Sequence, residues 1–323
     1  MIELPLSKPH KKSSVETTYD YLVIGLGAFG SSALLELKKQ GHKVLGIDQN
    51  LPGSYGTLSY GETRIFRQAH FEDDSFIPLS FDALAAWNEL ELNSGKSLLN
   101  RVGHKSYFKN NNKRFLEFKR LCDKHQIKTK INGNEITELD ASIIDVKSYF
   151  ELMLSLIGRE NYKLGEKVID ITGEEIIELK TEKKVYKTKN IVISAGQWSE
   201  ELLPRHLEFK NKVKCQRSPV LWFENTIGLS KSESYFDGVN NLYLIPEAST
   251  NRFKVFNYNY NDEYLSPKSH LKELDDNDRS LIKEFIKTKF GNLPIVDEYA
   301  CMYYATRDDK FYIDKLGKNS NYL

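Results

Sequence analysis

The chain has 323 residues, of which 40% are hydrophobic and 28% charged, which is ordinary for a globular protein large enough for two domains. Its 46 lysine and arginine residues balance 45 aspartate and glutamate residues, so no field of one sign favours nucleic acid or an acidic membrane as a partner. The 3 cysteines are scattered, which predicts no disulfide framework and no metal site and favours a reducing, cytoplasmic setting. No apolar stretch reaches the roughly 20 residues that span a bilayer.

The most informative stretch begins at residue 19 and reads YDYLVIGLGAFGSSALLELKKQGHKVLGIDQN. It predicts a buried strand over 21–24, then a helix that ends at Gly41, then a second strand over 43–47. Residues 1–18, which precede this unit, have no such pattern and are interpreted as a flexible extension. A G-x-G-x-x-G pattern joins the first strand to the helix.

The three glycines of this pattern have separate physical roles. Gly25 permits a tight turn, Gly27 lets a pyrophosphate approach the backbone, and Gly30 allows the helix to pack closely on the strand. The helix N-terminus offers unpaired N–H groups to the phosphates. Asp48, at the end of the second strand, can accept hydrogen bonds from a ribose and disfavours a 2′-phosphate. The pattern predicts a site for FAD or NAD, the alternative being a glycine-rich turn in another α/β protein.

A second motif, SYGETRIFRQAH, places Arg64 and Arg67 three residues apart. Two guanidinium groups at this spacing repel each other unless an anion lies near them, and arginine is suited to bidentate binding of carboxylate or phosphate. The alternative interpretation is a pair of surface arginines.

Four segments in order resemble the monomeric sarcosine oxidase and N-methyltryptophan oxidase family of D-amino-acid-oxidase-like flavoproteins. They are the glycine-rich unit, YGETRIFR at 60–67, NIVISAGQWSEELL at 190–203 and CMYYATRDDKFYID at 301–314. The resemblance implies an α/β fold in which a Rossmann-like FAD-binding domain is interleaved with an antiparallel-sheet α+β substrate domain. The FAD-binding domain is expected over 19–78 and 142–212, the substrate domain over 79–141 and 213–300, and an incomplete return to the FAD-binding domain over 301–323.

The resemblance also implies a reaction. A secondary or tertiary amino acid, N-methyl or cyclic, would be oxidised at its C–N bond by FAD, with O2 as the acceptor and H2O2 as a product. The partners would then be a small amino acid and O2, with no nucleic acid or membrane, and the protein would be a monomer. Two alternatives are a catalytically impaired relative that keeps the fold and weak nucleotide binding, and an NAD-dependent dehydrogenase.

The family pattern assigns roles to individual residues. Lys254 would activate oxygen, Arg64 would pack over the flavin ring and Tyr303 would lie near the substrate. Arg67 would bind the substrate carboxylate. The alternatives are a strand-edge lysine at 254 and an ordinary strand aromatic at 303. The wider implied sets are Tyr60 and Tyr258 for substrate, and Gly25, Gly27, Ala28, Phe29, Gly30, Asp48, Gln49, Arg64, Ile65, Val168, Ser194, Ala195, Gly196, Trp198, Cys301 and Met302 for FAD.

Cys301 matches the family cysteine that is bonded covalently to the flavin 8α-methyl group, the alternative being a buried structural cysteine. The chain also departs from the family. Tyr60 and Tyr258 stand where histidines are usual, the middle of the chain is shortened, and the sequence ends before the family's last strand and its G-x-S-G-H-G-x-K loop. The departures predict a different amine pocket and weak FAD binding unless the missing segment is supplied.

The remaining pattern predicts helices over 77–92, 114–125, 143–157 and 271–290, a hairpin over 167–187 that turns at Gly173, and antiparallel strands over 213–224 and 241–258. Helical periodicity places Leu79 and Leu281, among other apolar residues, in the core.

Overall fold

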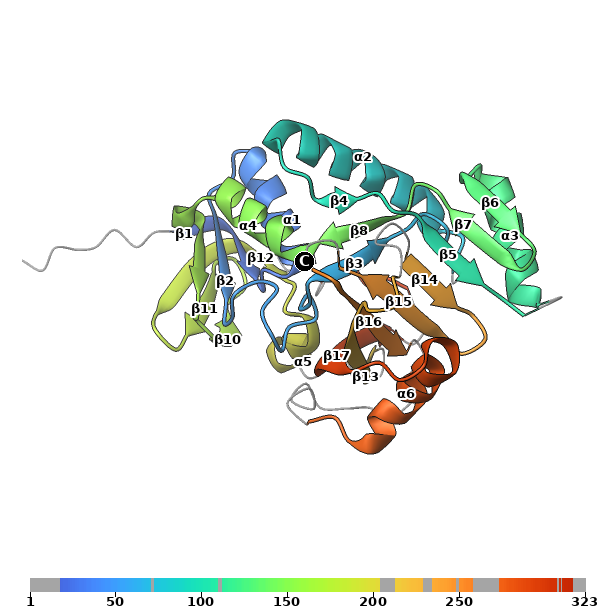
Figure 1. Cartoon of the computed structure of the whole chain (residues 1–323). Coiled ribbons are helices and arrows are strands. Elements are labelled where there is room, and N and C mark those ends of the chain that lie inside the picture. The colour runs from blue at the N-terminus through green and yellow to red at the C-terminus, as the bar shows by residue number, and fades with distance from the viewer. Residues whose placement is uncertain are drawn as a thin grey trace, which may run out of the picture.

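The computed structural model describes residues 18–70, 73–109, 112–203, 213–228, 234–247, 250–257, 273–306, 308 and 310–315. Within these residues the strands form three sheets, of 6, 8 and 3 strands. Figure 1 shows the 6-stranded sheet at one end of the molecule, the 8-stranded sheet at the other, and the small sheet between them. The expected combination of a Rossmann-like sheet with an antiparallel sheet is therefore confirmed.

The 6-stranded sheet, called the mixed sheet here, has the order β10-β11-β12-β1-β2-β9. Its parallel part comprises β9 (Tyr162–Leu164), β2 (Val44–Asp48), β1 (Thr18–Ile24) and β12 (Val185–Ile193). Helices α1 (Ala28–Lys39) and α4 (Val146–Ile157) pack on one face around Val23. Leu22 and Ile24 point to the other face, toward residues of the β10–β11 hairpin. Because β1 is buried on both faces, its sequence is a continuous apolar run.

The expected hairpin forms as β10 (Val168–Thr172) and β11 (Ile177–Thr181), with antiparallel pairing. Gly173 begins the turn with φ of 94°, in the region that favours glycine. A methyl group there would also overlap the carbonyl oxygen of Ile176. The turn residue was therefore predicted correctly, and its need for glycine is both conformational and steric.

The helix expected over 143–157 begins later than predicted. Ser142–Asp145 form strand β8, and α4 starts at Val146. The Asp145 carboxylate accepts a hydrogen bond from the Ser148 backbone N–H at 3.0 Å, so Asp145 is the N-cap. At the other end of α4, Lys38 donates to the carbonyl oxygens of Leu156 and Ile157 at 3.0 and 2.8 Å. The two helices on the mixed sheet are thereby tied together.

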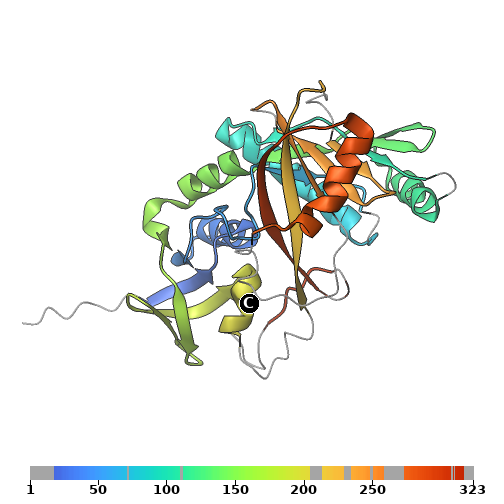
Figure 2. The same ribbon diagram turned by 60° about the horizontal axis from the view of Figure 1, so that its bottom comes forward.

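The 8-stranded sheet, called the large sheet here, has the order β17-β13-β16-β15-β14-β5-β7-β6. Its pairs are antiparallel except for β14 with β5. The strands are β5 (His104–Tyr107), β6 (Thr129–Asn132), β7 (Glu135–Glu138), β13 (Val213–Glu224), β14 (Ser234–Asp237), β15 (Leu242–Pro246), β16 (Arg252–Asn257) and β17 (Ile295–Thr306). Figure 2 shows β13 and β17 as two long neighbouring strands with α6 (Asp276–Phe290) alongside.

Side chains alternate between the two faces of the large sheet. Phe253 and Val255 point toward α6, where they meet Ile282 and Phe285. Lys254, between them in sequence, points to the opposite face. That face looks toward the 3-stranded sheet of β3 (Thr63–Phe66), β8 and β4 (Leu99–Asn100). The period-2 pattern of a strand thus separates a packing face from a face that can carry chemistry.

Three helices pack on the outside of the substrate half, and the first of them also reaches the cluster of α1 and α4 through Trp87 and Leu90. Helix α2 (Phe76–Ser94) buries Ile77 and Ser80, whereas Leu79 is 54% exposed. Helix α6 buries Ile282, and Leu281 is 38% exposed. Both core assignments were wrong, since the next residue, Ser80 or Ile282, is the buried one. Helical periodicity fixes the spacing of a buried face but not its exact register along the sequence. Helix α3 (Lys113–His125) covers the far end of the large sheet.

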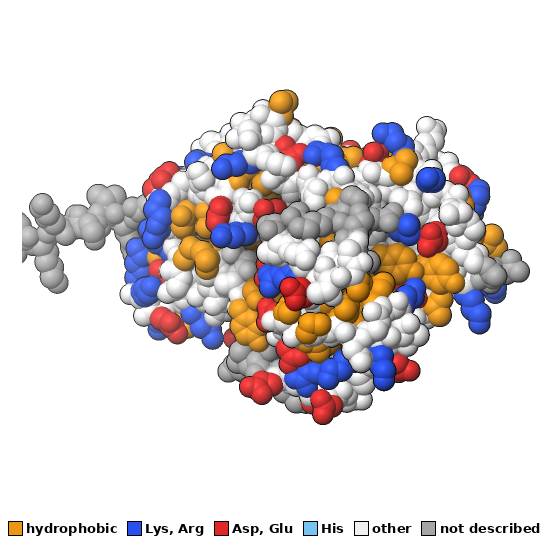
Figure 3. All heavy atoms as spheres, viewed as in Figure 1, with side chains coloured by type: hydrophobic (Ala, Val, Ile, Leu, Met, Phe, Trp, Pro, Cys, Tyr) orange, Lys and Arg blue, Asp and Glu red, His pale blue; other side chains and the backbone are white. Residues whose placement is uncertain are grey.

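The boundary expected at residue 301 falls inside β17, which continues in the large sheet to Thr306. No helix within the described part of the chain is long and apolar enough to cross a membrane. On the face seen in Figure 3, lysine and arginine side chains are interspersed with acidic ones, and hydrophobic side chains gather near its middle.

Candidate cofactor and active site

A cavity of about 730 Å³ opens where β1, β2 and β12 end. Parallel strands place the residues that follow them at one edge of the sheet, which is where nucleotides bind in doubly wound folds. The cavity brings together most of the cofactor residues expected from sequence, and these are Gly25, Gly27, Ala28, Phe29, Asp48, Gln49, Arg64, Val168, Ser194, Ala195, Gly196 and Trp198.

The glycines at the entrance of α1 have the geometry that a dinucleotide requires. Gly25 has φ of 85°, and Gly30 lies so close to the strand that a methyl group would overlap the Gly25 carbonyl oxygen. Gly27 faces open space except for Ser59 Oγ, which a methyl group would meet at 3.1 Å. Gly27, the N-cap residue, has no side chain of its own to cap the helix, and Ser59 Oγ accepts only from the Ala28 N–H, at 3.2 Å. The first turn of α1 is therefore a cradle that a Cβ would fill, and it suits a diphosphate.

Asp48 lies at the carboxyl end of β2 and lines the cavity. Its two oxygens accept hydrogen bonds from the backbone N–H groups of Leu26 at 2.7 Å and Asn50 at 2.8 Å. Burial raises the pKa of the carboxyl group, and these two bonds oppose that effect. The side chain is held in one orientation and keeps acceptor capacity for the hydroxyl groups of a ribose.

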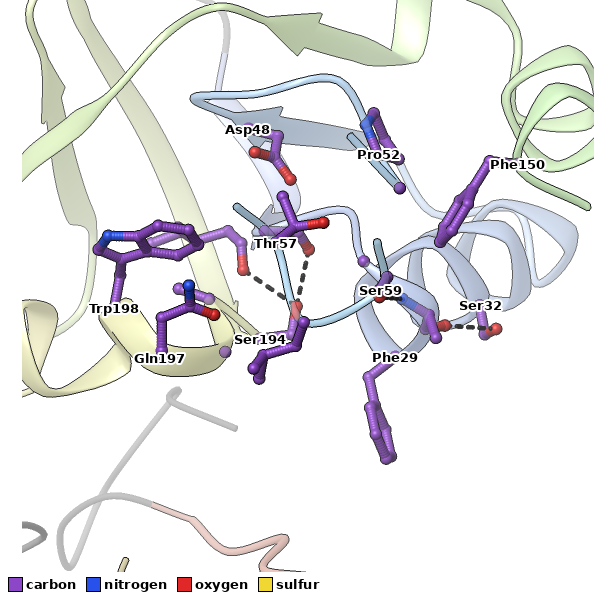
Figure 4. A pocket seen from close by; sticks show the side chains of 18 of the residues that line it. Phe29, Ser32, Asp48, Pro52, Thr57, Ser59, Phe150, Ser194, Gln197 and Trp198 are labelled. Atoms are coloured by element: carbon purple, nitrogen blue, oxygen red, sulfur yellow. Dashed lines mark hydrogen bonds between the residues drawn. The ribbon is translucent and has the colours of Figure 1, made fainter. Parts of the chain in front are cut away.

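The loop after β12 forms another wall of the cavity. Ser194 donates hydrogen bonds to the carbonyl oxygens of Ile24 and Gly25, at 3.0 and 2.8 Å, and so joins β12 to the glycine turn. Gln197 donates to the Gly56 carbonyl oxygen at 2.8 Å. In Figure 4, Trp198 and Phe150 lie on opposite sides of the cavity, with Asp48 between them.

Arg64 lines the cavity at the side nearest the large sheet. Its guanidinium group donates to the carbonyl oxygens of Leu58 at 3.2 Å, of Thr63 at 3.0 Å, and of Tyr60. Three backbone acceptors fix the group, and no carboxylate within the described residues forms an ion pair with it. Arg64 is consequently a positioned positive charge between the dinucleotide cavity and the substrate half.

Lys254 lies next to Arg64, on the face of the large sheet that points away from α6. The residue is 3% exposed, and its Nζ donates to the Thr63 carbonyl oxygen at 2.8 Å. Burial, together with the positive Arg64, lowers the pKa of Lys254 to about 7. The Trp222 ring lies 5.5 Å from Nζ. An amine that titrates near neutrality in a buried site is a candidate functional group.

Buried polar atoms around Lys254 have no partner among the described residues. They are Trp222 Nε1, Thr63 Oγ1 and Glu62 Oε2. Such atoms are uncommon in folded proteins and indicate a place where a ligand or water completes the hydrogen bonding. The unmet donors and acceptors support an active site on this face of the large sheet.

Cys301 shares this face. It lies two residues after Tyr299 on β17, so both side chains point to the same side, and it packs against the cluster that contains Trp222 and Tyr299. It is half-buried, and its thiol contacts the Met302 carbonyl oxygen at 3.6 Å. Trp222 links Cys301 to Lys254, since it belongs to this cluster and its ring lies 5.5 Å from Lys254 Nζ. Tyr60 packs edge-on against Tyr299, with ring centroids 4.9 Å apart. Cys301, Lys254 and Tyr60 are thus brought together from three separate segments.

Other expected site residues lie elsewhere. Arg67 follows β3 and donates to the Ala69 carbonyl oxygen, and its charge acts on the buried Glu138 and His104 rather than on the cavity. Tyr303 follows Cys301 on the same face and is 40% exposed. Gly30, Ile65, Cys301 and Met302 do not line the cavity, and Tyr258 is outside the described residues.

The structure adds cavity residues that were not predicted from sequence, among them Ser59, Glu166 and Gln197. Ser59 accepts a hydrogen bond from the Ala28 backbone N–H at 3.2 Å. Ser59 directly precedes the YGETRIFR motif and Gln197 lies within NIVISAGQWSEELL, so their places in the sequence could have predicted that they line the cavity. Glu166 has no such context and follows a strand of only three residues.

This fold and cavity define a dinucleotide-binding protein whose second sheet carries a buried lysine and a cysteine beside the site. A model of the FAD dependent oxidoreductase family matches residues 20–323, and the chain belongs to that family. FAD fits the residues present, with Gly27 and the start of α1 for the diphosphate and Asp48 for the ribose.

Known proteins of this family resemble the chain over most of its length. It is 24% identical over 340 residues to the monomeric sarcosine oxidase of Bacillus sp. (strain NS-129), covering 95% of this chain and 87% of the relative. It is 24% identical to the peroxisomal sarcosine oxidase of Homo sapiens, covering 94% and 85%. Among solved structures, L-proline dehydrogenase from P. horikoshii superposes with a TM-score of 0.80 at 16% identity, covering 95% and 87%.

Proposed function

We propose that this chain is an FAD-dependent oxidase of a secondary or tertiary amino acid, N-methyl or cyclic, which uses O2 and releases H2O2. FAD, when bound, accepts the electrons of the C–H bond next to the amine nitrogen. The observation that carries the proposal is the buried Lys254, whose pKa is lowered to about 7, beside Arg64 at the junction of the cavity and the large sheet. The similarity to sarcosine oxidases supports the substrate class.

The residues around Lys254 would have separate roles in the reaction with O2 and in substrate binding. Protonated Lys254 would stabilise the negative charge that develops on O2, and Arg64 would add a fixed positive charge. Tyr60 and Tyr303 would border the substrate, and Arg67 is proposed to bind its carboxylate. Because Arg67 donates to the Ala69 carbonyl oxygen and does not line the cavity, the proposal requires its side chain to turn toward the substrate.

Cys301 is the proposed covalent attachment point for the flavin. A bond from Sγ to the 8α carbon would replace one S–H and one C–H bond, and the two electrons released with two protons would pass to O2. The half-buried thiol on the same face as Lys254 supports this assignment. We also propose that the protein acts as a monomer, which the similarity to monomeric sarcosine oxidases supports, and in the cytoplasm, which its few, scattered cysteines favour.

The test is H2O2 release by purified protein supplied with FAD and a panel of sarcosine, N-methyl amino acids and L-proline. The proposal predicts H2O2 from at least one compound, with little or none from the Lys254→Met variant. Lys287→Met, on the exposed side of α6, is the matched control and should match the unmodified chain. If FAD binds and no compound yields H2O2 or reduces the flavin, the chain is a catalytically impaired relative instead.

A further inference from the structure

Glu166 is a buried carboxylate at the edge of the cavity. It follows β9, lines the cavity and is 4% exposed. Its Oε1 accepts hydrogen bonds from the hydroxyl groups of Thr181 at 2.7 Å and Tyr186 at 2.9 Å. Its Oε2 makes no hydrogen bond to any residue of the ranges that the structure describes. One oxygen is therefore fixed by the protein, and the other is left for a ligand.

The two hydroxyl groups orient the carboxylate. Thr181 ends β11 and Tyr186 lies near the start of β12, so both strands of one hairpin hold Oε1. Burial and the hydrogen bond to Glu166 raise the pKa of Tyr186, which keeps this phenol a donor at neutral pH. Oε2 is not among the fully buried atoms that lack a partner, so it remains accessible from the cavity that Glu166 lines. A bound molecule that covers Oε2 would have to supply a hydrogen-bond donor, because an acceptor buried without one is costly.

The position of Glu166 indicates which part of the bound molecule it meets. The strands β1, β2 and β9 are neighbours, spaced about 4.8 Å apart as in any sheet. Gly27 follows β1, Asp48 ends β2, and Glu166 follows β9, with its backbone N–H donating to the Asp48 carbonyl oxygen at 3.1 Å. A dinucleotide with its diphosphate at Gly27 and its ribose at Asp48 would therefore carry its base toward Glu166.

We propose that Glu166 Oε2 accepts a hydrogen bond from the exocyclic amino group of the adenine of FAD, and that Glu166 thereby selects an adenine-bearing dinucleotide. The assignment rests on the proposed FAD site and adds a side-chain determinant to it. A carboxylate suits this position because the amino group is the base's hydrogen-bond donor. A base without that group would leave Oε2 buried and unsatisfied.

The test compares the dissociation constants of FAD and of its 6-deamino analogue, in which hydrogen replaces the adenine amino group. The measurement uses quenching of flavin fluorescence in the Cys301→Ser background, where the bond proposed above cannot form and binding stays reversible. Because a hydrogen bond to a charged group is at stake, FAD should bind about 10- to 100-fold more tightly than the analogue. Glu166→Met should bind both ligands equally, and Glu166→Gln should show a smaller preference than the carboxylate. Glu178→Gln, which removes an exposed carboxylate from the same hairpin, should keep the full preference.

The outcomes separate this inference from the function on which it rests. Tight binding of FAD with equal affinity for the analogue would overturn the role of Glu166 alone, and this comparison needs no substitution at Glu166. The role of Glu166 would also be overturned if Glu166→Gln kept the full preference for FAD over the analogue that Glu178→Gln shows. Failure to bind FAD at all would overturn the proposed function and this assignment together.

Discussion

Lys254 Nζ donates a hydrogen bond of 2.8 Å to the backbone carbonyl oxygen of Thr63, which joins the large sheet to the strand that carries Arg64. The bond places a buried amine beside a fixed guanidinium group, and the two charges together with burial lower the pKa of Lys254 to about 7. The protonation state of one side chain at the domain junction therefore changes near neutral pH.

Reoxidation of the reduced protein by O2 should depend on this pKa. Lys254 is charged below about pH 7 and neutral above it, so the second-order rate with O2 should fall as the pH rises through about 7. Stopped-flow mixing of the reduced protein with oxygenated buffer across this range measures the rate. Lys254→Met should react slowly with O2 at every pH. If its rate instead fell with rising pH as in the unmodified chain, Lys254 would not be the group that controls the reaction with O2.

Two glycines of the same motif should respond differently to alanine. Gly30→Ala forces a methyl group onto the Gly25 carbonyl oxygen, which costs several kcal/mol or prevents folding. Gly27 has φ of −62°, which alanine tolerates, and its methyl group would meet only Ser59 Oγ at 3.1 Å.

Gly27→Ala should therefore melt within a few degrees of the unmodified chain yet lose most of its FAD affinity, since the methyl group occupies the path of the diphosphate. Thermal unfolding followed by circular dichroism and FAD titration measure the two effects. Equal FAD affinity in Gly27→Ala and the unmodified chain would place the diphosphate elsewhere.

The flavin should remain with the protein after acid precipitation if it is bonded to Cys301. Cys301→Ser should then release all flavin to the supernatant. Cys122→Ala is the matched control, because Cys122 is buried in α3 and burial raises the pKa of its thiol to about 12, which leaves it unreactive. Flavin in the supernatant of the unmodified chain would show that binding is non-covalent.

The N-cap of α4 offers a test of the fold itself. Asp145→Ala removes the acceptor for the Ser148 N–H and should lower the free energy of unfolding by about 1 kcal/mol. Lys147→Ala, at the exposed second residue of the same helix, should change it by less than about 0.5 kcal/mol. Chemical denaturation compares the two, and equal effects would mean that Asp145 does not cap the helix.

Local sequence rules predicted the nucleotide half well. Gly25, Gly30 and Asp48 act within one strand–turn–helix–strand unit, where spacing in sequence determines spacing in the fold. The hairpin at Gly173 is equally local.

The contact between Lys254 and Thr63 could not be derived from spacing in the sequence. Lys254 and Thr63 are 191 residues apart, and only the packing of the large sheet on the 3-stranded sheet brings them together. The resemblance to a family supplied Lys254 and Cys301, whereas Glu166 and Trp222 lie in no recognised motif and required the structure. The error at Leu79 has a different origin, since helical periodicity does not fix the register of the buried face, and Ser80 rather than Leu79 is buried in α2.

The central claim is most directly tested by the visible spectrum of the FAD-loaded protein under anaerobic conditions, before and after addition of sarcosine, N-methyl amino acids or L-proline. We expect at least one compound to bleach the oxidised flavin band, and air to restore it with release of H2O2. A band that no compound bleaches, or a protein that takes up no flavin, would contradict the assignment of this chain as an amino-acid oxidase.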